Sequence, residues 1–149
     1  MKVGIFPGSF DPFTKGHESI VRTALDFFDE IIIAIGVNSK KTAYFSTDKR
    51  IAHIKSLFKE RVSVVDYEGL TVDLCRKYSS PIILRGLRDS KDFEYEKSIA
   101  FMNRDLANFE TIFLLTDIHF SHINSSIVRE IHANGGDISS FVTNANILV

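Results

Sequence analysis

The chain has 149 residues, of which 44% are hydrophobic and 25% charged, and its 18 Lys and Arg against 19 Asp and Glu leave a net charge of -1. This length predicts a single domain, residues 1–149, that folds without disulfides or a structural metal, and the composition excludes intrinsic disorder. The small net charge argues against a broad surface for binding nucleic acid or membranes. A cytoplasmic protein is predicted, because the chain has one cysteine, no apolar run of membrane-spanning length and no signal-peptide core.

Short β-branched runs alternate along the chain with segments whose apolar residues recur at helical spacing. Strands are expected over 2–6, 30–37, 62–65, 81–84 and 111–115. Helices are expected after residue 16, from 46 or 47 to 58, over 72–78, from about 90 to 106, and over 125–133. This order predicts a small doubly wound, Rossmann-like α/β fold, with a five-stranded parallel sheet and helices on both faces.

Apolar side chains within the helices indicate which surfaces should be buried. In the long helix that begins near residue 90, Phe93, Ile99, Met102 and Leu106 are expected to face the core. His53 and His132 lie in amphipathic segments and are expected on the surface.

Ligands of doubly wound folds bind at the carboxyl ends of the strands, near the switch in strand order. That rule points to three loops, 7–16, 85–89 and 116–124, which also hold the unusual residues. The first loop ends at Gly16-His17, where the free N–H groups of a helix start favour an anion. It has neither the Walker A nor the dinucleotide-binding spacing. Taken alone, it is equally well interpreted as a Gly/Pro turn with a surface histidine.

Two arginines, Arg85 and Arg88, directly follow the fourth predicted strand. Guanidinium groups bind phosphate in bidentate fashion, so this pair is a candidate phosphate clamp. The open alternative is that they pair with Asp89, Asp92 or Glu96 in a solvated cluster.

Polar residues at two further places lie at the same predicted edge of the sheet. Asn124, Ser125 and Ser126 either cap the last helix or hold phosphate oxygens, with Arg129 one turn further along. The lysine pair at 40–41 is most simply solvated, although one of the two is a candidate phosphate ligand. Together the loops indicate phosphoryl or nucleotidyl transfer by positioning and charge neutralisation.

Three segments carry a family resemblance. Pro7-Gly8-Ser9-Phe10-Asp11-Pro12 with Thr14-Lys15-Gly16-His17 resembles the Thr-x-Gly-His signature of the nucleotidyltransferase superfamily. Ile123-Asn124-Ser125-Ser126-Ile127-Val128-Arg129 is similar to its second signature, Ile-Ser-Ser-Ser-x-x-Arg/Lys. Arg85-Gly86-Leu87-Arg88 followed by Asp92-Phe93-Glu94-Tyr95-Glu96 resembles one branch, the bacterial phosphopantetheine adenylyltransferases.

This resemblance implies transfer of AMP from ATP to 4′-phosphopantetheine, giving dephospho-coenzyme A and pyrophosphate in the penultimate step of coenzyme A biosynthesis. It implies a Mg²⁺-dependent, cytoplasmic homohexamer. The catalytic residues it implies are His17, Lys41 and Arg88, and the substrate-binding residues are Ser9, Lys41, Thr71 and Arg85. The ATP-binding residues it implies are Ser9, Phe10, His17, Gly86, Leu87, Arg88, Glu96, Phe120, Ser121, His122, Ile123, Asn124, Ser125 and Ser126.

The chain departs from the family pattern in three places. Ser9 stands where Thr is usual, Asn124 stands where Ser is usual, and the chain ends early at Val149, so a curtailed C-terminal helix is expected. Lys40 stays an alternative to Lys41 as the phosphate lysine. The competing functions are another nucleotidyltransferase, using glycerol 3-phosphate with CTP or nicotinamide mononucleotide with ATP, and a non-catalytic nucleotide sensor on the same fold.

Overall fold

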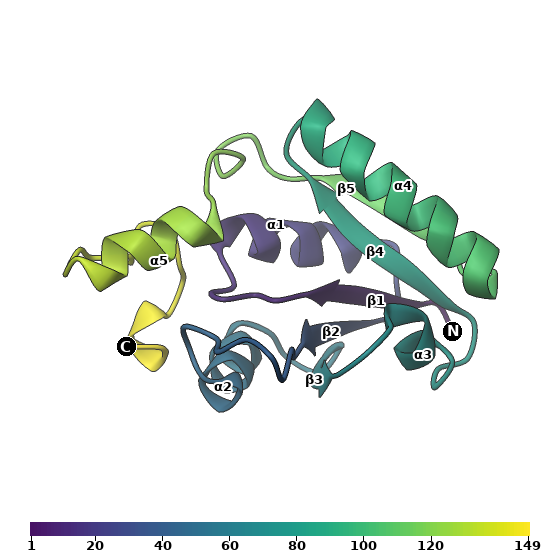
Figure 1. The fold of residues 1–149 in the computed structure, drawn as a ribbon, viewed down its shortest axis with the longest axis horizontal. Coiled ribbons are helices and arrows are strands. Elements are labelled where there is room, and N and C mark those ends of the chain that lie inside the picture. Colours follow the sequence, from purple (N-terminus) through teal and green to yellow (C-terminus); the bar gives the residue numbers. More distant parts are fainter.

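The computed structural model describes residues 1–149 (Figure 1). One parallel sheet holds five strands in the order β3-β2-β1-β4-β5, with β1 (Val3–Gly8), β2 (Glu30–Gly36), β3 (Val62–Tyr67), β4 (Pro81–Leu87) and β5 (Thr111–Leu115). The helices are α1 (Lys15–Ala24), α2 (Thr47–Leu57), α3 (Thr71–Cys75), α4 (Ser90–Ala107) and α5 (Ser125–Ala133). The predicted Rossmann-like α/β class is confirmed.

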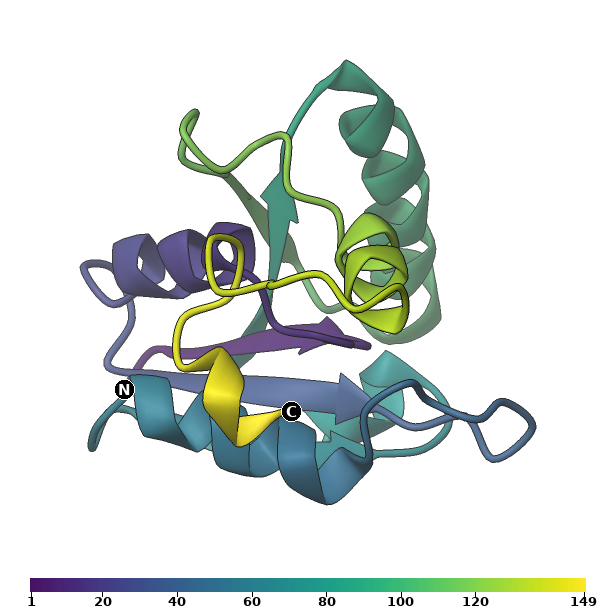
Figure 2. The same ribbon diagram turned by 90° about the vertical axis from the view of Figure 1, so that its left-hand side faces the viewer.

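Strand β2 shows why both faces of the sheet are covered. Ile31, Ile33 and Ile35 pack in one core cluster with residues of α1 and α2, whereas Ile32 and Ala34 pack in a second cluster with residues of α3. A central parallel strand must be apolar on both faces because helices cover each of them. Figure 2 shows α1 and α4 on opposite sides of β4.

Strand β1 is the switch point of the sheet, since β2 lies on one side of it and β4 on the other. Its pairing with β2 continues to Gly8, but its pairing with β4 ends where Ile5 meets Ile83. Beyond that pair the two strands continue to Gly8 and Leu87 without a shared ladder. This is the crevice in which such folds bind ligands.

The C-terminal segment builds a third cluster, in which Ile138, Val142 and Leu148 pack with buried residues of the loops and α5. The expectation that His53 lies on the surface is wrong, because this segment covers α2 and leaves the side chain fully buried. The Nε2–H of His53 donates to the Thr143 carbonyl over 2.7 Å. This segment ends in a 3-10 turn, Ala145–Ile147.

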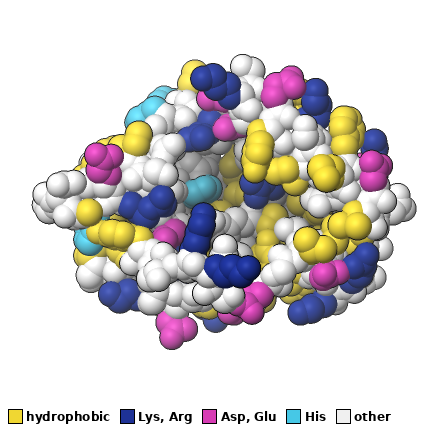
Figure 3. All heavy atoms as spheres, viewed as in Figure 1, with side chains coloured by type: hydrophobic (Ala, Val, Ile, Leu, Met, Phe, Trp, Pro, Cys, Tyr) yellow, Lys and Arg dark blue, Asp and Glu magenta, His cyan; other side chains and the backbone are white.

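Helix α4 departs from expectation in the side it buries. Phe93, Met102 and Leu106 were predicted to face the core, but they are 40%, 71% and 57% exposed, and Glu96 is the one buried residue of the helix. The prediction fails because α4 lies along the outer part of the sheet, where no other element of the chain covers its far side (Figure 2). The helix therefore presents apolar side chains outward, over the part of the surface where hydrophobic residues gather in Figure 3.

None of the helices combines the length with the apolar composition that crossing a membrane requires.

Candidate active site

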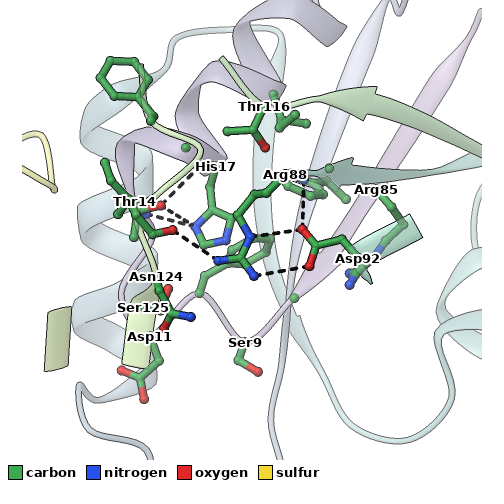
Figure 4. A pocket seen from close by; sticks show the side chains of 18 of the residues that line it. Ser9, Asp11, Thr14, His17, Arg85, Arg88, Asp92, Thr116, Asn124 and Ser125 are labelled. Carbon is green, nitrogen blue, oxygen red and sulfur yellow. Dashed lines mark hydrogen bonds and ion pairs between the residues drawn. The ribbon is translucent and has the colours of Figure 1, made fainter. Parts of the chain in front are cut away.

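A cavity of about 440 Å³ opens at the carboxyl ends of β1 and β4, within the usual size range of ligand sites. The loop after β1, the start of α4, the loop after β5 and the first turn of α5 all line it. Residues of all three loops that the sequence indicated, 7–16, 85–89 and 116–124, line it as well. Figure 3 shows the hollow with a histidine at its floor and Lys and Arg side chains around it, and Figure 4 shows His17, Arg88 and Asp92 within it.

His17 is held by a reciprocal cap at the start of α1. The Thr14 N–H donates to His17 Nδ1 over 3.0 Å, and the His17 N–H donates to Thr14 Oγ1 over 3.5 Å. Because Nδ1 accepts a hydrogen bond, the neutral ring carries its proton on Nε2. The cap therefore fixes the tautomer and leaves an N–H donor on the side of the ring away from Thr14.

The charge state of His17 follows from its surroundings. Burial, together with the positive charges of Arg85 and Arg88, lowers the pKa of His17 to about 4. The imidazole is consequently neutral at pH 7. It can donate a hydrogen bond to a phosphate oxygen, whereas positive charge at the site comes from the arginines.

Arg88 lies at the mouth of the cavity and is held by Asp92. Its Nε donates to Asp92 Oδ2 over 3.1 Å, its Nη2 to Oδ1 over 3.3 Å, and its backbone N–H to Oδ2 over 2.9 Å. Burial alone would raise the pKa of Asp92, but the hydrogen bonds and charge of Arg88 outweigh it and hold that pKa below its usual range. The carboxylate thus stays ionised and orients the guanidinium (Figure 4).

Arg85 crosses the gap between β1 and β4. Its Nε and Nη2 form a two-bond pair with the Glu96 carboxylate, at 2.8 and 2.7 Å, and its Nη1 donates to the Pro7 carbonyl. Both arginines therefore pair with carboxylates, as one of the two sequence hypotheses expected, but Glu96 is buried rather than solvated, and both arginines also line the cavity. The clamp and ion-pair interpretations are compatible, since a guanidinium carries five donors and each pair uses only some of them.

The start of α5 combines capping with cavity lining. Asn124 Oδ1 accepts from the backbone N–H groups of Ser126 and Ile127, at 2.8 and 3.3 Å. Ser125 Oγ donates to the Pro12 carbonyl over 3.0 Å, which joins this helix to the loop after β1. Asn124 therefore caps α5, and the positive end of the α5 dipole faces the cavity.

A second cavity of about 250 Å³ adjoins the first. Thr71 lines it, with its hydroxyl 3.0 Å from the Tyr67 hydroxyl. Ser9, Arg85 and Glu96 line both cavities, so together they form the wall between them. The arrangement provides two adjacent compartments with cationic and hydrogen-bonding groups at their junction.

Most of the residues that the sequence singled out come together here. Those on the first cavity are Ser9, Phe10, His17, Arg85, Gly86, Arg88, Glu96, Phe120, Ile123, Asn124, Ser125 and Ser126. Leu87, which is buried in the sheet, does not line it, and neither do Ser121 and His122. Lys40 and Lys41 are exposed and line neither cavity, so the assignment of Lys41 to a phosphate stays a prediction.

Thr14, Asp92 and Thr116 line the cavity but were not predicted as site residues. The spacing of Asp92, four residues after Arg88 at the start of a helix, was the available signal for it. Thr116 is the first residue of the loop 116–124 that the sequence indicated, although no role was assigned to it. Its backbone N–H donates to the Leu87 carbonyl, which brings it beside β4.

The chain resembles known proteins over nearly its whole length. The profile of the cytidylyltransferase-like family matches residues 5–131. A phosphopantetheine adenylyltransferase of Flavobacterium psychrophilum is 55% identical over 147 residues, covering 97% of each chain, and one of Flavobacterium johnsoniae is 51% identical over the same length and coverage. A bifunctional NMN adenylyltransferase/ADP ribose pyrophosphatase from Francisella tularensis superposes with a TM-score of 0.73 at 20% identity, over 98% of this chain and 48% of that one. The last likeness shows the fold alone.

Proposed function

The chain belongs to the phosphopantetheine adenylyltransferases within the cytidylyltransferase-like family, and from that premise we propose how its two cavities carry out the reaction. The enzyme transfers the adenylyl group of ATP to 4′-phosphopantetheine and gives dephospho-coenzyme A and pyrophosphate. The observation that carries the proposal is the shared wall of the two cavities. ATP occupies the larger cavity and the pantetheine arm the smaller, so that the two phosphates meet beside Ser9 and Arg85.

The chemistry needs little from the protein beyond position and charge. The phosphate of 4′-phosphopantetheine is already an anionic nucleophile and requires no general base. One of its oxygens attacks the α-phosphorus of ATP, a new P–O bond forms, and the bond to the bridging oxygen breaks. Pyrophosphate leaves with that electron pair. Holding both reactants in line supplies much of the rate enhancement.

His17 and Arg88 act on the charge that develops in this step. The Nε2–H of His17 donates to an oxygen of the transferring phosphate, with its direction fixed by the Thr14 cap. Arg88 supplies a full positive charge at the mouth of the same cavity. Preorganised donors of this kind stabilise a transition state without reorganising during the reaction. Lys41, carried by a loop beside the site, is proposed to hold the acceptor phosphate.

The carboxylates of the cavity do not fit a resident Mg²⁺ site. Asp11 accepts from the backbone N–H groups of Tyr44 and Phe45, while Asp92 and Glu96 are paired with arginines. No group of three or more His, Cys, Asp or Glu side chains is placed to hold a metal ion. We therefore propose that Mg²⁺ enters as the Mg·ATP complex, held by phosphate oxygens and water, as this ion commonly is.

We also propose that the enzyme is a homohexamer and acts in the cytoplasm. The support for assembly is the outward side of α4, where Tyr95, Met102 and Leu106 are 69%, 71% and 57% exposed. Steps of seven and four residues return to one side of a helix, so the three form a stripe. Monomeric proteins rarely expose large contiguous apolar patches. Light scattering of the purified protein should give six times the mass of the chain.

The function is tested by pyrophosphate release from purified protein with ATP, Mg²⁺ and 4′-phosphopantetheine, each omitted in turn. Release is expected only when all three are present, with dephospho-coenzyme A detected by mass spectrometry. Release with nicotinamide mononucleotide, or with glycerol 3-phosphate and CTP, would assign another nucleotidyltransferase activity. Binding of ATP without release in any mixture would favour a nucleotide sensor.

A further inference from the structure

Arg50, in the first turn of α2, is a buried arginine without an acidic partner. Its side chain is 3% exposed, and no carboxylate lies within ion-pair distance of it. Its Nε donates to the Phe45 carbonyl over 3.0 Å, its Nη1 to the Ser9 carbonyl over 2.6 Å, and its Nη2 to Thr47 Oγ1 over 3.2 Å. A buried charge with only neutral partners is costly. Its presence here calls for an explanation.

The Ser9 carbonyl that Arg50 holds belongs to a strained part of the loop after β1. The next residue, Phe10, has a φ of 47°, in the left-handed region that non-glycine residues rarely adopt. On its other side, the Asp11 carbonyl accepts from Arg129 Nη1 over 2.8 Å. The carbonyls on either side of Phe10 are thus each held by an arginine from a different helix. Such conformations persist only when the surrounding structure enforces them, and they concentrate at active sites.

The bond to Arg50 also decides where the Phe10 N–H points. In a trans peptide the C=O and the following N–H point in opposite directions. The Ser9 carbonyl points toward Arg50, which does not line the cavity, so the Phe10 N–H points the opposite way, toward the cavity that Ser9 and Phe10 line. This N–H donates to no other group of the chain. It is a donor left available for a ligand.

We propose that Arg50 is a positioning residue for adenylyl transfer. It touches neither substrate but fixes the Ser9–Phe10 peptide, so that the Phe10 N–H and the Ser9 hydroxyl face the transferring phosphate. Its buried positive charge lies directly behind this peptide and adds to the potential that attracts two anions to one place. The inference rests on the proposed function.

The test compares R50M, which keeps much of the length and apolar volume of the side chain but removes its charge and donors, with R50K, which restores the charge and a single donor nitrogen but not the three-nitrogen fork. We expect R50M to lower kcat by about tenfold to 10²-fold with KM for ATP changed less than about threefold, because misplacement of a transition-state donor affects turnover first. R50K should recover part of this loss.

Arg61 offers a matched control. It also donates to three backbone carbonyls, those of Leu25, Phe28 and Asp29, but it directly precedes β3 and so lies at the opposite edge of the sheet. R61M should lose stability and keep kcat. A merely structural role for Arg50 predicts equal kcat for R50M and R61M once both are measured at a temperature where they are fully folded. That result, or an R50M kcat within twofold of wild type, overturns the proposal.

Amide hydrogen exchange gives a readout that does not depend on R50M folding. In the wild-type enzyme, the Phe10 N–H should exchange rapidly when the cavity is free and become protected when Mg·ATP is added, and R50K should lose at least tenfold of that protection. A Phe10 N–H that ATP leaves unprotected in the wild type overturns the proposal. If wild type binds ATP but releases no pyrophosphate, the proposed function fails, and the exchange result still decides whether Arg50 directs the Phe10 N–H toward bound nucleotide.

Discussion

The neutral state of His17 can be tested through the pH dependence of stability. The folded protein holds its pKa at about 4, against 6.5 for an ordinary histidine, because of burial and the charges of Arg85 and Arg88. Between these values the unfolded chain binds a proton that the folded chain does not. The free energy of unfolding therefore falls as the pH falls through this window, and the contribution is fully present only above the unfolded value.

The magnitude follows from the size of the shift. One unit of pKa corresponds to about 1.4 kcal/mol, so the full shift of the His17 pKa changes the free energy of unfolding by about 3 kcal/mol. About 2 kcal/mol of this is lost by about pH 5. The variant H17Q keeps a side-chain donor and acceptor but cannot titrate. Other ionisable groups, including the buried His53, are present in both proteins and largely cancel in the difference.

Urea unfolding of wild type and H17Q from about pH 8 to pH 4 measures this difference directly. The wild type should lose about 2 kcal/mol more than H17Q between about pH 8 and pH 5. Parallel stability curves would refute the reasoning, as would an imidazole resonance of His17 that titrates near the ordinary value. Turnover should likewise show no inflection from His17 between about pH 8 and pH 6, because the neutral form is already complete there.

Three further outcomes are expected. The variant H17A should lower kcat by about 10²–10³-fold, in steady-state assays at saturating ATP, with an unchanged circular dichroism spectrum, since it removes one transition-state donor. The variant E96Q should lower the free energy of unfolding by about 1–3 kcal/mol in urea titrations, because it weakens the two-bond pair to the arginine on β4. As the control for E96Q, the variant D73N removes an exposed ion pair and should change the free energy of unfolding by less than about 1 kcal/mol. The variant M102E should shift the light-scattering mass toward that of a single chain, because it places a charge on the outward stripe of α4, whereas F27E, at an equally exposed position away from α4, should not.

Local patterns in the sequence determined the class of the fold and the location of the site. The β-branched run Ile31 to Ile35 predicts a strand buried on both faces, and it forms β2, an interior strand between β3 and β1. The ends of parallel strands meet at one edge, so the loops after β1, β4 and β5 had to be neighbours once the strands were assigned. His17 and Asn124 were identifiable because caps and helix starts are local features.

Only the tertiary structure decided how the side chains of these loops are partnered and which helix surfaces are covered. Whether Arg85 meets Glu96 depends on the gap between two strands, and the burial of His53 depends on a segment ninety residues away in sequence. Arg50 was assigned no role from the sequence, and the one proposed for it follows from the carbonyl it meets across the fold. Periodicity indicates which side of a segment is apolar. Burial and charge pairing also depend on which other segment packs against that side, and the local sequence does not contain this information. For the same reason, Phe93, Met102 and Leu106 of α4 were expected in the core although they are exposed.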